Sequence, residues 1–182
     1  GTPILNYNTS ESVRFATLSK GAIMNSTGSI DASGSLVSGS VDNIRYQIAN
    51  SDTGSGTFSL IIRQGDDNTN NQIVLETWTN LSMDPTAPNY VSRVIGNQSA
   101  SYSQTDNQIV VSGDFRNNSK YVYVASVLTP TPLYFDNTGN AKAQYTGSIP
   151  TNASGSFSGA TGTLATAAGA KYYDSIIVKY RV

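Results

Sequence analysis

Short runs of alternating apolar and polar residues constrain the fold of this chain more than any other feature of its sequence. In residues 42–50 (DNIRYQIAN), Ile44, Tyr46 and Ile48 fall at every second position, and polar residues such as Arg45 lie between them. Successive side chains of a strand point to opposite faces of the sheet. The run therefore predicts a strand with one buried face and one face in water, with Arg45 on the wet side.

The same alternation recurs along the chain and predicts a mainly β fold. Residues 57–64 (TFSLIIRQ) are followed by a polar stretch, residues 65–71 (GDDNTNN), and then by a second apolar run at residues 72–78. Polar turn residues between two such runs are typical of a hairpin with a long loop. We expect further strands at residues 12–18, 121–128 and 172–182. The run at 121–128 is apolar on both faces, as expected of a strand in the middle of a sandwich.

These strands predict a two-layer antiparallel β-sandwich with one or a few short flanking helices, in a single domain over residues 1–182. The expected core residues lie on apolar strand faces: Phe58, Leu60, Ile62, Leu75, Tyr123 and Ile177 or one of its neighbours. Residues 26–41 and 152–170 are rich in small residues and carry isolated apolar ones. We interpret both stretches as surface loops, each pinned by buried side chains: Ile30, Leu36, Val41, Phe157 and Leu164.

One short helix is predicted, at about residues 88–95. The residue before a proline is disfavoured in the α region, and proline is well tolerated at the first helical position, so the helix should begin at Pro88. Tyr90, Val94 and Ile95 contribute to a narrow apolar stripe. Gly96 is predicted to end the helix in a left-handed conformation. Two turns are too short to be stable alone, so we expect this helix to pack on the sheet.

Composition argues against most catalytic and nucleic-acid-binding functions. Only 13% of residues are charged, the formal net charge is -1, and the chain has neither histidine nor cysteine. The usual general base, the usual zinc ligands and thiol chemistry are therefore missing. A basic stripe for nucleic acid and an apolar run of about 18 residues for a membrane are missing as well. We expect no enzyme activity and no catalytic, cofactor-binding or metal-binding residues.

The polar loop at residues 66–71 invites two alternative interpretations as a site. Asp66, Asn68 and Asn70 alternate like the first ligands of a calcium loop, but Asn71 replaces the required glycine and Thr77 the required glutamate. We interpret the stretch as a solvated hairpin loop. The adjacent carboxylates of Asp66 and Asp67 could in principle act as acid and base. Neighbours in an extended segment point to opposite sides, which makes this pair a poor one.

Residues 58–97 carry a resemblance to a known family. The phrase LETWTNLSMDP at residues 75–85, followed by Pro88-Asn89-Tyr90 and Val94-Ile95-Gly96, resembles the corresponding segment of tail sheath proteins from large contractile-tailed phages. Shorter stretches agree with the same family: GAIMNST, SGSVDNIRY, NNSKYVYV and YTGSIPTNASGSFSGATG. The resemblance implies a β-sandwich domain of a structural protein that surrounds the tail tube and contracts during genome delivery.

The resemblance also implies the partners and the location of the chain. Partners would be other copies of the sheath subunit in a helical lattice, and the tail tube and baseplate through parts of the subunit that are missing here. No nucleic acid and no membrane insertion are implied. The chain would occupy the virion tail sheath, and the host cytoplasm during assembly. Because sheath proteins are much longer, and this chain begins at Gly1 and stops at Val182 within a predicted strand, we expect an outer, middle domain. The alternative function is a secreted or surface β-sandwich adhesin that binds host glycans.

Overall fold

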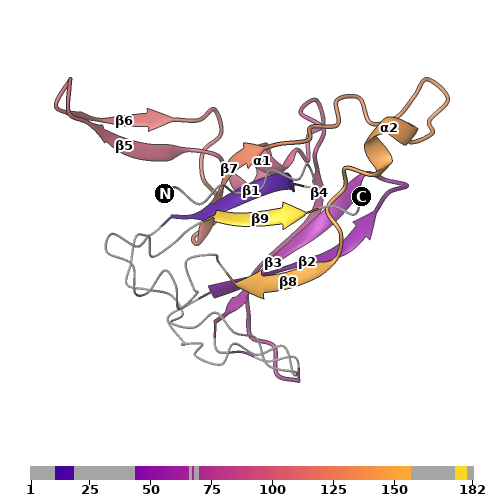
Figure 1. Cartoon of the computed structure of the whole chain (residues 1–182), viewed down its shortest axis with the longest axis horizontal. Coiled ribbons are helices and arrows are strands. Elements are labelled where there is room, and N and C mark those ends of the chain that lie inside the picture. Colours follow the sequence, from indigo (N-terminus) through magenta and orange to yellow (C-terminus); the bar gives the residue numbers. More distant parts are fainter. Residues whose placement is uncertain (1–10, 19–43, 66, 68–69, 157–174, 180–182) are drawn as a thin grey trace, which may run out of the picture.

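Two β-sheets packed on a common core and one separate hairpin form the described part of the chain (Figure 1). The computed structural model describes residues 11–18, 44–65, 67, 70–156 and 175–179. The fold is mainly β and sandwich-like, as predicted.

A four-stranded antiparallel sheet forms one layer, in the order β4-β3-β2-β8. Its strands are β2 (Ile44–Asp52), β3 (Thr57–Gln64), β4 (Val74–Ser82) and β8 (Ala153–Ser156). The predicted hairpin of β3 and β4 is confirmed. The interpretation of residues 152–170 as a surface loop is wrong for residues 153–156, because these small residues supply the backbone partners that the edge of β2 requires. Residues 157–170, with Phe157 and Leu164, lie outside the described residues, as do residues 26–41 with Ile30, Leu36 and Val41.

A three-stranded sheet forms the other layer, in the order β7-β1-β9. It consists of β1 (Glu11–Thr17), β7 (Val122–Val127) and β9 (Ser175–Lys179). The run at 121–128 supplies strand β7 of the sandwich, which lies at one edge of this described sheet, with β1 in the central place. The apolar side chains on the two faces of β7 have different surroundings. Val122 and Val124 point into the core, whereas Tyr123 faces the base of the hairpin.

Two short helices flank the sheets: α1 (Val91–Ile95) and α2 (Ala143–Thr146). Helix α1 begins three residues later than predicted, because Tyr90 keeps an extended backbone and bridges Ser82 of β4. Pro88 instead belongs to the preceding turn, where the backbone N–H of Ser82 donates to the carbonyl of Asn89 at 2.9 Å.

The remaining strands, β5 (Ser99–Ser103) and β6 (Gln108–Ser112), pair only with each other in the described part of the chain. In Figure 1 this hairpin stands away from both layers, at the opposite end of the molecule from α2.

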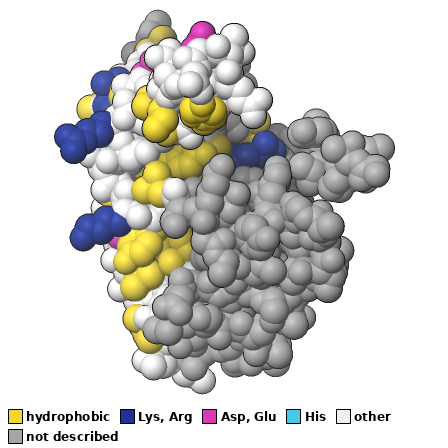
Figure 2. Space-filling view, turned by 90° about the vertical axis from the view of Figure 1, so that its left-hand side faces the viewer, with side chains coloured by type: hydrophobic (Ala, Val, Ile, Leu, Met, Phe, Trp, Pro, Cys, Tyr) yellow, Lys and Arg dark blue, Asp and Glu magenta, His cyan; other side chains and the backbone are white. Residues whose placement is uncertain are grey.

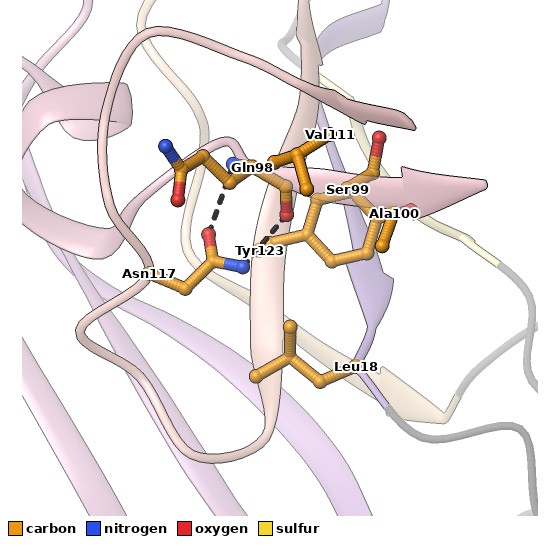
Figure 3. Close-up of a pocket in the computed structure, with 7 residues that line it drawn as sticks. All are labelled: Leu18, Gln98, Ser99, Ala100, Val111, Asn117 and Tyr123. Atoms are coloured by element: carbon orange, nitrogen blue, oxygen red, sulfur yellow. Dashed lines mark hydrogen bonds between the residues drawn. The ribbon is translucent and has the colours of Figure 1, made fainter. Parts of the chain in front are cut away.

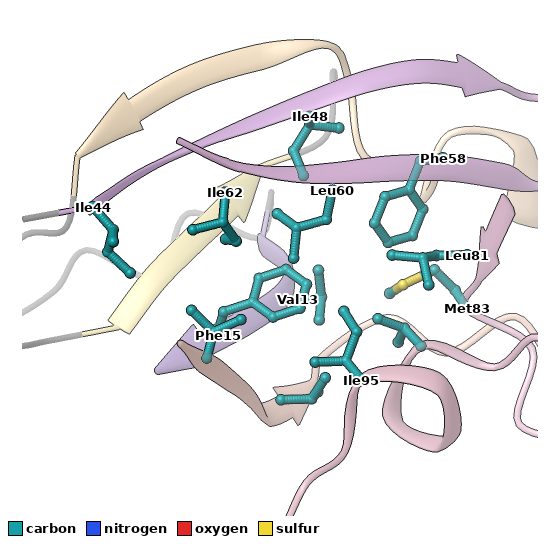
Figure 4. Packing of buried hydrophobic residues seen from close by; sticks show 13 residues of the cluster. Val13, Phe15, Ile44, Ile48, Phe58, Leu60, Ile62, Leu81, Met83 and Ile95 are labelled. Carbon is teal, nitrogen blue, oxygen red and sulfur yellow. The ribbon is translucent and has the colours of Figure 1, made fainter. Parts of the chain in front are cut away.

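The core lies between the two sheets and is closed at one end by α1 (Figure 4). Phe58, Leu60 and Ile62 are buried, as predicted, and Leu75 is half-buried against them. The prediction for Tyr123 is wrong, because its neighbours on β7 take the core-facing positions. Ile177 lies on β9, whose side chains fall outside the described part of the structure. The cluster also contains Val13, Phe15, Ile44, Ile48, Leu81, Met83, Val91, Ile95, Val122 and Val124.

Candidate functional site

An ionic cluster lies on the outer face of the four-stranded sheet, and one of its members, Asp67, comes from the loop whose sequence partly matches a calcium loop. Arg45 and Arg63 lie directly opposite each other on β2 and β3. The buried carboxylate of Asp67 reaches both of them: Oδ1 lies 3.1 Å from Arg45 Nη1, and Oδ2 lies 2.6 Å from Arg63 Nε. Asp67 Oδ2 also accepts a hydrogen bond from the backbone N–H of Ile73 at 3.0 Å. The cluster therefore ties the loop between β3 and β4 to the sheet.

This cluster corrects two predictions from the sequence. Alternation predicts Arg45 on a wet face, but its side chain is buried, because the loop carrying Asp67 folds back over that face. The loop is likewise not simply solvated, since Asp67 is 2% exposed. The Asp67 carboxylate is already engaged by two guanidinium groups and by the N–H of Ile73, so the contacts of Asp67 have a structural explanation. Asp66 and Asn68 lie outside the described residues. Among the residues that the structure does describe, no group of three or more acidic side chains could hold a metal ion.

The most exposed apolar surface of the described chain lies on the β5–β6 hairpin. The strand register pairs Ala100 with Val111 and Tyr102 with Ile109, so these four side chains share one face of the hairpin. We call this the apolar face. Ile109 is 71% exposed, and Val111 and Tyr102 are nearly as open. Figure 2 views the end of the molecule from which the hairpin projects, and hydrophobic side chains show there in patches that run from the upper part of the view down the described surface. The opposite face carries serines, Gln108 and Val110.

Two glycines fix the point at which the hairpin leaves the domain. Gly96 has φ 107° and ψ 153°, so its φ is positive as predicted, but the conformation is extended and not that of a left-handed helix cap. A Cβ atom on Gly96 would lie 2.3 Å from the Cα of Asn117. Gly113, at the other end of the hairpin, has φ 105°, and a Cβ there would lie 2.3 Å from the carbonyl oxygen of Asn97. The two chain segments therefore cross in close contact at the base.

Asparagine side chains hold these crossing segments together. Asn97 Oδ1 accepts from the N–H of Phe115 at 2.8 Å. Asn117 accepts from the N–H of Gln98 at 3.0 Å through Oδ1 and donates to the carbonyl of Gln98 at 2.7 Å through Nδ2. These bonds satisfy backbone groups that would otherwise lack strand partners. The hairpin consequently has a well-ordered base and an exposed tip.

The segment that follows the hairpin is anchored to the domain as well. Phe115 packs edge-to-face with Tyr90, at 6.3 Å between ring centroids, and the Arg93 guanidinium lies 5.0 Å from the Phe115 centroid. The Glu76 carboxylate on β4 accepts hydrogen bonds from Ser119 Oγ at 2.6 Å and from the N–H of Lys120 at 2.9 Å.

A small pocket lies where the hairpin meets β7 (Figure 3). Its volume is about 340 Å³, near the lower limit for a small-molecule site. The Tyr123 ring lies beside Ala100 and Val111, so the pocket continues the apolar face toward the domain. Its polar lining is already engaged in part, because Asn117 is bonded to Gln98. The lining residues are Leu18, Gln98, Ser99, Ala100, Val111, Asn117 and Tyr123.

A buried carboxylate elsewhere has a structural explanation. Asp84 follows β4, and its burial alone would raise its pKa. Hydrogen bonds from the side chain and backbone of Thr86, and from the backbone N–H groups of Tyr134 and Leu133, outweigh burial and lower the pKa. Asp84 therefore stabilises the turn that leads to α1 and joins it to the loop at 133–134.

Sequence reasoning missed the hairpin, since it predicted no strand between residues 97 and 121. A signal was present: Ile109, Val110 and Val111 form a β-prone run, and polar residues at 104–107 precede it. Strand β5 is rich in serine and has few β-prone residues, so the sequence does not predict a strand that could pair with this run. Neither described helix has the length and apolar character that crossing a membrane would require.

Comparison of the chain with protein-family models, with curated proteins and with solved structures found no match. The tail sheath resemblance gains no support from these comparisons and stays a prediction.

Proposed function

We propose that this chain is a structural, assembly-forming domain, and that the assembly is the contractile tail sheath of a phage, with the chain as an outer domain of the subunit. The observation that carries the assembly function is the β5–β6 hairpin. Its base is fixed by hydrogen bonds and close backbone contacts, while its apolar face is open to solvent. Exposed apolar surface that is held in place by an ordered scaffold is typical of protein–protein contacts.

The sheath assignment depends on residues 75–96. In the fold these residues form one continuous unit: β4, the turn at Asp84 and helix α1. Leu81, Met83, Val91 and Ile95 from this unit are all buried in the core. The residues that carry the resemblance are thus the residues that close one end of the sandwich, so the quoted phrase coincides with one structural unit of this domain.

We propose no enzymatic function, as the composition without histidine or cysteine leads us to expect. The pocket at the hairpin base has Tyr123 as its only titratable side chain, and its volume is small. Asp67 holds the loop between β3 and β4 on the sheet through Arg45 and Arg63, which explains why this carboxylate is buried.

A glycan-binding adhesin remains the second candidate, because the pocket combines an aromatic ring with amide side chains. That lining suits a sugar. However, Asn117 already uses its oxygen and its nitrogen on Gln98, which leaves it one donor hydrogen and one lone pair for a ligand. Tight glycan binding would require groups that this pocket does not offer freely.

Immunogold electron microscopy tests the proposal. Antibodies raised against the 182-residue chain should label the outside of contractile tails in lysates of the host that produces the protein, in both the extended and the contracted state. The same chain should give no saturable signal with immobilised glycans. Labelling confined to cell surfaces, together with saturable glycan binding that Tyr123→Ala removes, would support the adhesin and contradict the sheath assignment.

A further inference from the structure

We propose that the apolar face of the β5–β6 hairpin in one copy of this chain binds the exposed side chains of Leu133 and Phe135 in the next copy, with Leu133 in the pocket at the base of the hairpin. We call Leu133 and Phe135 the apolar knob. The inference rests on the proposed assembly function and names one contact of that assembly.

The apolar knob is a second place where large apolar side chains are open to solvent but held by an ordered scaffold. Leu133 is 63% exposed and Phe135 nearly half exposed, while Tyr134 between them is buried. The Tyr134 hydroxyl donates to the carbonyl of Thr53 at 2.6 Å. The backbone N–H groups of Leu133 and Tyr134 donate to the buried Asp84 carboxylate. The knob is therefore fixed to the sandwich through its middle residue.

The backbone of Leu133 indicates that its outward position serves a purpose. Its φ is 51°, in the left-handed region that bulky apolar residues rarely adopt. A residue in such a conformation costs free energy and persists only where its surroundings hold it there. In the monomer the exposed Leu133 side chain buries too little apolar area to offset this cost. A partner that covers the side chain would supply the missing gain.

The knob and the hairpin lie at opposite ends of the molecule. The Tyr134 ring stacks on Tyr145 of α2, with 6.4 Å between ring centroids, so the knob lies beside α2. Figure 1 shows the hairpin at the other end. Two different patches make a heterologous contact, in which each copy offers its knob to one neighbour and its hairpin to another. Such a contact repeats in one direction, so it can continue through a helical lattice of identically oriented subunits.

The shapes of the two patches match. Val111 and the ring of Tyr123 line the apolar side of the pocket, whose volume of about 340 Å³ accommodates an aliphatic side chain such as that of Leu133 (Figure 3). Ile109 lies two residues from Val111 on the same face, and Phe135 lies two residues from Leu133. Two residues span at most about 7 Å in either chain. With Leu133 in the pocket, Phe135 therefore lies within reach of Ile109.

Charge favours a second copy over other partners. Asp106 is the only charged residue between residues 98 and 113, and residues 128–135 contain none. Asp136 and Lys142, which follow the knob, have opposite charges. Neither patch thus offers a counter-charge to a nucleic acid or a strongly charged peptide. Two uncharged apolar patches bind each other without taking an ion out of water.

The contact should be weak between two isolated chains. The few side chains on each side bury well below the roughly 1,200 Å² of a stable interface, so a dissociation constant on the order of hundreds of micromolar is expected. In a lattice, many such contacts act in parallel and become effective. The isolated chain should accordingly be a monomer at low micromolar concentration and should form head-to-tail oligomers at much higher concentration.

Substitution of the knob is the first test. Leu133→Asn should weaken self-association about tenfold or more, measured by sedimentation equilibrium up to about 1 mM, because it removes the apolar side chain that is buried in the contact. Asparagine tolerates a positive φ better than leucine, so the melting temperature should equal that of the parent or exceed it. Leu133→Met keeps the apolar volume and should retain association. Unchanged association in Leu133→Asn would overturn the proposal.

Substitution of the hairpin is the second test. Val111→Lys places a charge on the apolar face beside the pocket and should weaken self-association as much as Leu133→Asn does. The matched control is Val110→Lys, on the same strand and also exposed, but on the opposite face. It should associate like the parent. Equal losses at residues 110 and 111 would overturn the assignment of the contact to the apolar face.

A mixture of the two variants tests whether the contact is heterologous. Leu133→Asn keeps an intact hairpin and Val111→Lys keeps an intact knob, so the equimolar mixture should form heterodimers although neither variant associates alone. These dimers should not grow, because both of their free patches are altered. A monomeric mixture would overturn the proposal. Heterodimers of a chain whose antibodies label no tails would refute the sheath assignment and leave the contact intact. Labelled tails with a monomeric mixture would do the reverse.

Discussion

Strands β3 and β6 have similar apolar residues but opposite surroundings. Leu60 on β3 is fully buried between two sheets, whereas Ile109 on β6 is 71% exposed. The difference lies in what covers each strand. Strand β3 has neighbours on both edges and a second sheet over its face, while β6 has one neighbour and no covering layer in the described structure. Apolar residues thus predict a strand, but they do not show whether another layer of the same chain covers it.

Removing Asp67 should have the largest effect on the sandwich side of this comparison. Breaking a buried ion pair by deleting one partner typically costs about 3–5 kcal/mol, and Asp67→Ala takes the shared carboxylate from Arg45 and Arg63. Urea denaturation measures the loss of unfolding free energy. Asp106→Ala, in the exposed tip of the hairpin, is the control and should stay within about 0.5 kcal/mol of the parent. Equal stabilities for the two variants would mean that the ionic cluster contributes nothing.

Truncating one apolar residue in each region tests the comparison directly. Leu60→Ala should cost about 2–5 kcal/mol, because it leaves a cavity in a packed core. Ile109→Ala should leave the stability of the monomer almost unchanged, since little apolar area is buried there. Thermal and urea unfolding at low micromolar concentration check both values. A loss below about 0.5 kcal/mol for Leu60→Ala would contradict the described core.

Gly96→Val should disturb the junction between the two regions. The backbone conformation alone costs on the order of 1–3 kcal/mol for a residue with a side chain, and the new Cβ would collide with the backbone of Asn117. NMR should show the largest shift changes at the hairpin base, together with a lower melting temperature. Gly147→Ala is the matched control, because its φ is -73° and its Cβ would meet no atom within 4 Å. An unchanged melting temperature for Gly96→Val would contradict the close crossing at residues 96 and 117.

Acid should have the smallest effect, and it should act on the sandwich rather than the hairpin. The pKa of Asp84 is lower in the folded chain than its unfolded value of about 3.9, so its contribution to stability is complete above about pH 5. That contribution is lost as the pH falls through the lowered pKa. In Asp84→Asn the decrease in stability below pH 4 should be shallower than in the parent, with Asp114→Asn as an exposed control. An identical pH profile would show that Asp84 is not stabilised as described.

The sequence predicted the sandwich well where burial follows the alternation of apolar and polar residues within one strand. Alternation identified the core faces of β2 and β3, because burial there depends on the period of the strand. It failed for Arg45, whose burial depends on Asp67 from a loop that no period describes. It failed for Tyr123, because β7 is apolar on both faces and a pattern of that kind does not say which face is inside. The hairpin was missed because serine, a poor strand former, dominates β5. The Asn97 and Asn117 contacts at its base join residues across an intervening hairpin and leave no local signal.

The position of β1 has a consequence for how the chain reaches this fold. Strands β2, β3 and β4 follow one another and can pair as soon as they are synthesised. β1 is made before them, yet its partners come from far along the chain: Val13 pairs with Val127 on one side and with Val178 on the other. Non-local pairings of this kind form slowly and leave apolar strands unpaired in the meantime. During synthesis on the ribosome, β1 cannot meet both of its partners until residues 175–179 have emerged, so the three-stranded sheet should close after the four-stranded one.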